Sequence, residues 1–127
     1  CESSSMRVMA IERVSHRLIT LLTTRKGFHK LFVMSEPLKE SEIESRLVNL
    51  QDWRHQEDHL KKSFAFTNFR DAMVFIVRLS YEAEQQDHHP EIFNCYNRVE
   101  IALNTHDAGG KVTEKDFSLA TAIDAVA

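Results

Sequence analysis

The sequence predicts an α+β domain in which a four-stranded antiparallel sheet carries helices on one face. Four short segments alternate between apolar and polar residues, the period of a half-buried strand. Segments with the helical period lie before, between and after two strand pairs, and neither pair has a long crossover within it. The 127 residues suffice for one domain, and 43% hydrophobic with 28% charged residues is an ordinary globular composition.

Residues 1–35 form a distinct basic extension, with six basic side chains against two acidic ones. The charge balance reverses near Met34–Pro37, so we place the domain at residues 36–127. Apolar residues recur at helical spacing between Met6 and Leu22, which predicts an additional N-terminal helix. Two other interpretations are an organelle-targeting segment, typical of basic amphipathic N-termini, and sequence upstream of a true start at Met34.

The first element of the domain is a short helix. Ser41 and Glu44 have the spacing of a capping box, and Ile43, Leu47 and Leu50 then lie on one face. A hairpin follows, with a first strand at Trp53–Gln56, a turn near Glu57–Asp58 and a second strand at 60–66. The second strand is predicted to bury its even-numbered aromatic residues.

A long helix begins after Asn68, which can cap it, and Pro90 prevents its continuation. Its predicted buried face consists of Phe69, Ala72, Met73, Ile76, Leu79, Ser80 and Ala83. Two strands follow at Ile92–Tyr96 and Val99–Thr105, and we expect the second to be an edge strand able to pair with a second subunit. Gly109 and Gly110 make a loop, and Thr113 with Asp116 caps a last helix.

Several classes of function have no support in the sequence. Two isolated cysteines exclude a disulfide framework or a cysteine-rich zinc site and fit a reducing, cytoplasmic compartment. A net charge of −3 argues against direct nucleic-acid binding. No apolar run reaches the roughly 20 residues of a membrane-spanning helix. Phosphate-binding glycine loops are also missing.

Seven histidines are many for this length, and three have informative positions. His88 and His89 lie where the long helix must end, and His106 lies where a strand ends, both places where scaffolds present functional groups. Three imidazoles near one pocket suit proton transfer at neutral pH. One alternative is that the histidines cap the C-terminus of the helix. A second is a three-histidine metal site, which is less favoured because His88 and His89 are adjacent in the sequence. His55 and His59 are expected on the surface.

The residues around these histidines resemble one family closely. The run from Glu84 through Asp87, His88, His89 and Pro90 to Glu91, followed by Tyr96-Asn97, Thr105-His106 and Asp116, is similar to the signature of pterin-4a-carbinolamine dehydratases. The resemblance covers about residues 38–126. It implies an enzyme that removes water from 4a-hydroxytetrahydrobiopterin to give quinonoid dihydrobiopterin, which regenerates the pterin cofactor of aromatic amino-acid hydroxylases.

The resemblance also implies roles for individual residues. His88 and His106 would act as acids at the 4a-hydroxyl, and His89 would bind the pterin and assist proton removal. Glu84 and Asp87 would orient these groups, and Asp116 would cap its helix. The substrate would be bound by His89, Pro90, Glu91, Phe93, Tyr96 and Thr105.

By the same resemblance we expect a homodimer or homotetramer that needs neither a metal ion nor an organic cofactor. A different class of function stays open: a non-enzymatic dimerisation cofactor, or transcriptional co-activator, that binds a helical protein partner. Such a protein would still bind its partner after loss of all three histidines, whereas the dehydratase would lose its activity.

Overall fold

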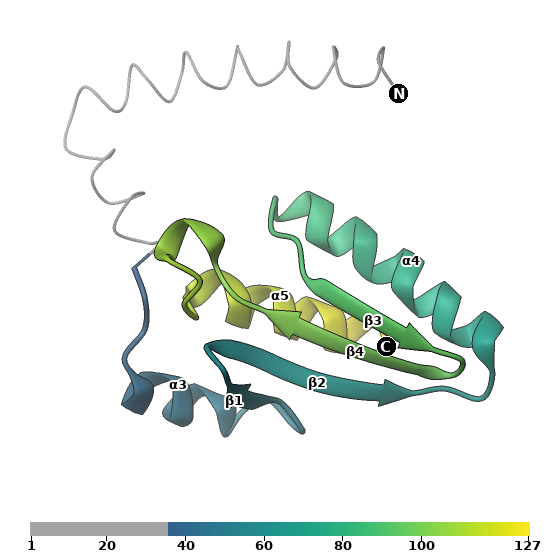
Figure 1. Cartoon of the computed structure of the whole chain (residues 1–127), viewed down its shortest axis with the longest axis horizontal. Coiled ribbons are helices and arrows are strands. Elements are labelled where there is room, and N and C mark those ends of the chain that lie inside the picture. The colour runs from purple at the N-terminus through teal and green to yellow at the C-terminus, as the bar shows by residue number, and fades with distance from the viewer. Residues whose placement is uncertain (1–35) are drawn as a thin grey trace, which may run out of the picture. The chain divides into compact units, whose positions relative to one another are not determined.

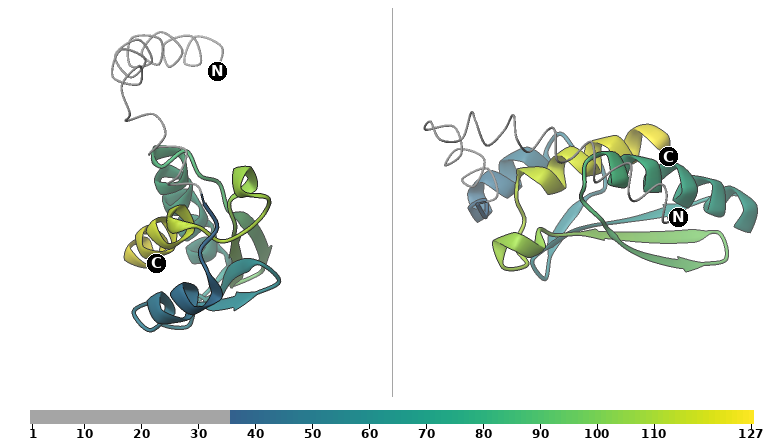
Figure 2. Two further views of the ribbon diagram at one scale, coloured as in Figure 1. Left: turned by 90° about the vertical axis from the view of Figure 1, so that its left-hand side faces the viewer. Right: turned by 90° about the horizontal axis from the view of Figure 1, so that it is seen from above.

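In the computed structural model, which describes residues 36–127, helices lie on one face of a four-stranded antiparallel sheet (Figures 1 and 2). The elements are α3 (Glu40–Leu47), β1 (Arg54–Gln56), β2 (His59–Ala65), α4 (Phe69–Gln85), β3 (Glu91–Cys95), β4 (Arg98–Leu103), the 3-10 turn η1 (His106–Ala108) and α5 (Glu114–Val126). The predicted fold class and order of elements are confirmed. The helix predicted within residues 1–35 lies outside the described residues.

The sheet has the strand order β1-β2-β4-β3. Both predicted hairpins form, and β2 joins them by pairing with β4, with Leu60 opposite Leu103 and Phe64 opposite Val99. This corrects the expectation that residues 99–105 form an edge strand, because β4 lies between β2 and β3. The edges of the sheet are β1 and β3.

The core lies between the sheet and the helices. Alternation directs Leu60 and Phe64 of β2 and Val99, Ile101 and Leu103 of β4 toward α4 and α5, and all five are buried. The opposite face of the sheet is open to solvent in the part of the chain that is described, as the view from above shows (Figure 2). Burying each large apolar side chain contributes about 1.5–3 kcal/mol.

Helix α4 begins as predicted, because the Asn68 side chain accepts a hydrogen bond from the Asp71 backbone N–H at 2.9 Å. The predicted buried face is partly wrong. Its buried residues are Ala72, Phe75, Leu79 and Ala83, whereas the predicted Phe69 and Ser80 are exposed. The buried stripe is therefore centred on Phe75, which contacts the aromatic rings of Phe64 and Phe66 at centroid distances of 4.7 and 4.9 Å.

Helix α3 starts earlier than its predicted capping box. It begins at Glu40, and the Glu42 carboxylate accepts a hydrogen bond from the Lys39 backbone N–H at 2.9 Å. Glu42, rather than the predicted Glu44, is therefore the carboxylate of the capping box. The helix ends at Leu47, which leaves the predicted Leu50 in the following turn. Within residues 36–127, no helix is both long and apolar enough to cross a membrane.

Candidate active site

His88, His89 and His106 line one hollow of about 360 Å³, a volume typical of small-molecule sites. The hollow lies where α4 ends, β3 begins and β4 runs into η1. Its lining residues are Asp87, His88, His89, Glu91, Asn104, Thr105, His106, Asp107 and Lys115. The structure therefore brings together residues that are up to 28 positions apart in the sequence.

The C-terminus of α4 positions His88. Asp87 has a left-handed backbone with φ +48, and its N–H bonds the Glu84 carbonyl at 3.1 Å. The next N–H, of His88, reaches back to the Ala83 carbonyl at 3.0 Å. These two bonds form a Schellman motif, which ends the helix and turns the chain sharply. The turn directs the His88 side chain inward, where it is only 8% exposed.

His88 is held by a fully buried carboxylate. Its Nε2 lies 2.6 Å from Asp116 Oδ1, and Asp116 is 0% exposed. The other oxygen, Oδ2, accepts the Thr105 hydroxyl at 2.9 Å and the Thr113 backbone N–H at 2.8 Å. Asp116 does cap α5, as expected, but it also links the ends of α4 and β4. That second role was not predicted.

The hydrogen bonds around Asp116 define where the protons lie. A carboxylate only accepts, so the Nε2 of His88 carries a proton and, in the neutral ring, Nδ1 carries the lone pair. Thr105 likewise gives its proton to Asp116, so the Thr113 hydroxyl donates to Thr105, 2.6 Å away. Within residues 36–127, the Nδ1 of His88 has no hydrogen-bond partner and is left to act on a ligand in the hollow.

The other two histidines are more exposed. The Nε2 of His89 lies 3.0 Å from Glu84 Oε2, with the His89 side chain 61% exposed. This contact can orient the His89 ring. His106 stands on η1 and is exposed. The three imidazoles thus differ in restraint: one is fixed and buried, one is oriented, and one is free among the described residues.

The loop after η1 shapes the remaining side of the hollow. Gly109 and Gly110 both have left-handed backbones, with φ +73 and +74, which favour glycine. They return the chain so that the Thr105 N–H bonds the Lys111 carbonyl at 2.9 Å. The Lys111 ammonium in turn donates to Asp58 at 2.9 Å, and this hydrogen bond lowers the pKa of the Asp58 carboxyl below its ordinary value.

Carboxylates outnumber cations around the hollow. Asp87, Glu91 and Asp107 face a single lysine, Lys115, which follows the N-cap of α5. Three lining residues were not predicted from the sequence: Asn104, Asp107 and Lys115. The Thr113 capping signal could have indicated Lys115, because the first turn of a helix that begins beside a site presents its side chains to that site.

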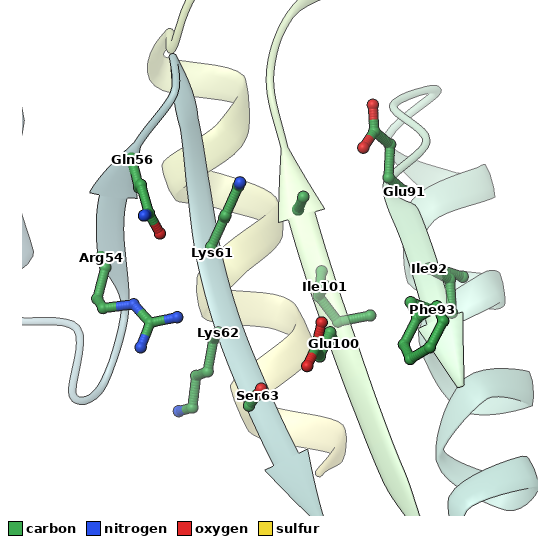
Figure 3. Close-up of a pocket in the computed structure, with 11 residues that line it drawn as sticks. Arg54, Gln56, Lys61, Lys62, Ser63, Glu91, Ile92, Phe93, Glu100 and Ile101 are labelled. Carbon is green, nitrogen blue, oxygen red and sulfur yellow. The ribbon is translucent and has the colours of Figure 1, made fainter. Parts of the chain in front are cut away.

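Three residues expected to bind substrate, Pro90, Phe93 and Tyr96, are not among those that line the histidine hollow, although Pro90 lies in the chain between two lining residues. Tyr96 is in the turn between β3 and β4, 63% exposed with φ +52, at the opposite end of β3 from the histidines. Five residue-to-residue steps of about 3.3 Å each separate it from Glu91. Phe93 lines a second hollow of about 420 Å³ on the open face of the sheet. Figure 3 shows that hollow, with Arg54 from β1, Lys61 from β2 and Glu91 at the start of β3.

The two hollows differ in chemistry. The open-face hollow holds charged, polar and apolar groups but no histidine, whereas the histidine hollow holds three proton-transfer groups. Glu91 lines both. Among residues 36–127, no three His, Cys, Asp or Glu side chains are grouped so that they could hold a metal ion. The expected surface histidines His55 and His59 are in fact half-buried.

Residues 36–126 match the family model described as pterin 4 alpha carbinolamine dehydratase. A protein of Opitutus terrae, provisionally named a pterin-4-alpha-carbinolamine dehydratase, is 49% identical over 83 residues, which are 65% of this chain and 86% of that protein. A protein of Christiangramia forsetii with the same provisional name is 45% identical over 91 residues, 72% of this chain and 93% of its own.

Two solved structures are similar. A transcriptional coactivator/pterin dehydratase from Brucella melitensis matches with a TM-score of 0.69 and 38% identity, over 72% of this chain and 99% of that one. A pterin dehydratase-like protein, identified as a RuBisCO assembly factor in the alpha-carboxysome, matches with a TM-score of 0.51 and 28% identity, over 60% and 89%. These relatives thus include proteins described by a partner-related role.

Proposed function

The chain belongs to the pterin 4 alpha carbinolamine dehydratase family, and from this membership we propose that it dehydrates 4a-hydroxytetrahydrobiopterin in the histidine hollow. The observation that carries the proposal is the grouping of His88, His89 and His106 around one cavity, with His88 fixed by buried Asp116. The product would be quinonoid dihydrobiopterin, recycled as the cofactor of aromatic amino-acid hydroxylases.

The reaction needs two proton transfers. The C4a–O bond breaks as the departing hydroxyl takes a proton and leaves as water. The N5–H proton goes to a base, and its electron pair forms the N5=C4a double bond. Each positioned acid or base typically accelerates such a step about 10²- to 10⁴-fold.

We assign the acid step to His88 and His106 and the removal of the N5 proton to His89. His88 has a defined tautomer with Nδ1 available, so a protonated His88 would donate from that atom while Asp116 stabilises the imidazolium. His89 is oriented by Glu84, whose carboxylate accepts from Nε2 and leaves Nδ1 of the neutral ring to act as the base. Thr105 and Glu91 would contact the pterin from the wall of the hollow.

The decisive experiment follows dehydration of 4a-hydroxytetrahydrobiopterin, generated in place by an aromatic amino-acid hydroxylase. We expect the native chain to accelerate the reaction, His89→Ala to reduce kcat at least 100-fold, and a chelator to have no effect. His55→Ala is the matched control, since His55 is half-buried on β1 and lies outside the hollow. A folded native chain that does not exceed the buffer rate would refute the catalytic assignment.

A protein partner is the second proposal, and a specific surface favours it. Val74, Val77 and Tyr81 on α4 are 43, 55 and 73% exposed and lie within one helix face, opposite the buried stripe. We propose that this face forms a helix–helix contact, either between copies in a homodimer or homotetramer or with a helical protein partner. We place the protein in the cytoplasm, where the exposed, free Cys95 would stay reduced.

A further inference from the structure

One buried side-chain polar atom within residues 36–127 has no hydrogen-bond partner, and it is Nε2 of His59. His59 begins β2, and its side chain is only 19% exposed. Buried polar atoms in folded proteins nearly always have a partner, so this exception needs a physical explanation. The groups around the ring supply one.

The other ring nitrogen has a defined protonation state. Nδ1 lies 2.6 Å from the Glu57 carbonyl oxygen, which can only accept, so Nδ1 carries the proton. In the neutral ring Nε2 is then an acceptor. The group that it faces is the Glu91 carboxylate, 3.6 Å away, which is also an acceptor. A proton on Nε2 would convert this mismatched pair into a charge-assisted hydrogen bond.

Glu91 connects this pair to the candidate active site. Its carboxylate lies beside His59, although Glu91 is on β3 and His59 is on β2. Glu91 lines both the histidine hollow and the open-face hollow, and Figure 3 shows it in the second of these, at the start of β3. Its side chain is 76% exposed, and within residues 36–127 it makes no other ion pair or hydrogen bond. Among residues 36–127, His59 is therefore the group that contacts the Glu91 carboxylate and can restrain it.

We propose that His59 is a positioning residue which, in its imidazolium form, holds the Glu91 carboxylate at the rim of the histidine hollow and thereby tightens pterin binding. The proposal rests on the proposed function for the role of Glu91 in the site. His59 acts through Glu91 rather than on the substrate. The other charged and titratable groups that surround it are Glu57 and Asp58 in the turn, Arg54 and His55 on β1, and Lys61 and Lys111, which pair with the turn carboxylates.

Two substitutions separate the two states of the ring. In His59→Asn the amide can keep the bond to the Glu57 carbonyl but presents nothing to Glu91, as the neutral ring does. In His59→Gln the longer amide presents a permanent donor to Glu91, as the imidazolium does. His55→Asn removes a histidine from the same hairpin but from the other face, and serves as the matched control.

The first readout is KM for 4a-hydroxytetrahydrobiopterin at pH 6 and pH 8, because the proposed contact with Glu91 needs the imidazolium form of the ring. Relative to His59→Asn at the same pH, the native chain should have a KM about three- to fivefold lower at pH 6 and equal at pH 8. The KM of His59→Gln should be lower than that of His59→Asn at both pH values. The kcat should be the same in the native chain, His59→Asn and His59→Gln. Equal KM ratios at both pH values, or a change confined to kcat, would overturn the proposal.

The second readout does not depend on activity. The long-range 1H–15N spectrum of the full chain at pH 8 should show the Nδ1–H tautomer of His59. The Glu91 carboxyl carbon signal should move between pH 6 and 8 in the native chain and in His55→Asn, and move less in His59→Asn, in which the three histidines of the hollow remain. An unchanged Glu91 response in His59→Asn would refute the pair. No dehydration by any variant, with this response intact, would defeat the proposed function alone.

Discussion

Asp116→Asn tests the link between the buried network and the chemistry of the hollow, because the change is isosteric. Asp116 accepts three hydrogen bonds at 2.6, 2.9 and 2.8 Å from His88, Thr105 and Thr113. The amide oxygen can keep the bonds of the two threonines. The amide NH2 then faces Nε2 of His88 and must donate to it, which forces the ring into the opposite tautomer with its proton on Nδ1.

The expected magnitudes follow from these contacts. Hydrogen bonds to a charged group are worth about 1.5–3 kcal/mol each and neutral ones about 0.5–1.5, so three weakened bonds sum to roughly 3 kcal/mol. Relief from burying a charge offsets part of this. We expect a net loss near 2 kcal/mol, or roughly 8–16 °C in Tm for a domain of this size. The wrong tautomer should lower kcat by about 10²- to 10⁴-fold, far more than the loss of stability explains.

Thermal unfolding followed by circular dichroism, together with kcat measured well below Tm, checks both values. Asp124→Asn is the matched control on the same helix, because Asp124 accepts from Trp53 at 3.0 Å and Lys62 at 2.8 Å and lies outside the hollow. It should cost comparable stability and leave kcat within twofold. Full kcat in a folded Asp116→Asn chain would refute the view that Asp116 defines the working tautomer of His88.

Three further predictions concern stability and assembly. The Lys111 hydrogen bond lowers the pKa of the Asp58 carboxyl in the folded chain. The ionised carboxyl therefore stabilises the fold fully above its ordinary pKa near 3.8, and this stabilisation is lost as pH falls through the lowered value. The Tm difference between the native chain and Asp58→Asn should accordingly shrink below about pH 4. Val77→Glu should dissociate the proposed oligomer in light scattering, whereas Val48→Glu, at a position 84% exposed on α3's C-cap, should not. Asp87→Gly should keep the free energy of unfolding within about 1 kcal/mol, whereas Asp87→Val should lose roughly 1–3 kcal/mol because valine resists the left-handed backbone; equal unfolding midpoints in urea would contradict this.

The fold could be predicted because its elements are encoded locally. Alternation around Leu60 and Val99 identifies the strands, and Asn68 and Pro90 mark the limits of α4. The order of the two hairpins in the sheet is not local, since either strand of each hairpin could have paired with the other hairpin. The prediction of an edge strand at 99–105 failed for that reason. The buried face of α4 was misassigned because Phe69 and Phe75 are equally apolar in the sequence.

The candidate site was predictable only in part. His88 and His89 adjoin Pro90, so one turn presents both, and a strand end presents His106. The bond from His88 to Asp116 joins segments 28 residues apart and has no signature in spacing. Phe93 and Tyr96 were expected to bind substrate through the family resemblance, and the structure places them along and beyond β3, because an extended strand carries its residues steadily away from its start.

The contacts of Asp116 also bear on how the chain opens. They tie the end of α4, the end of β4 and the first turn of α5, so fraying of that single turn releases His88 while the sheet stays paired. Local opening of this kind costs less free energy than global unfolding. Catalytic activity should consequently disappear at lower urea concentrations than the far-ultraviolet signal of the sheet and helices. Loss of the proposed dehydratase activity would then report this local opening before the chain unfolds globally.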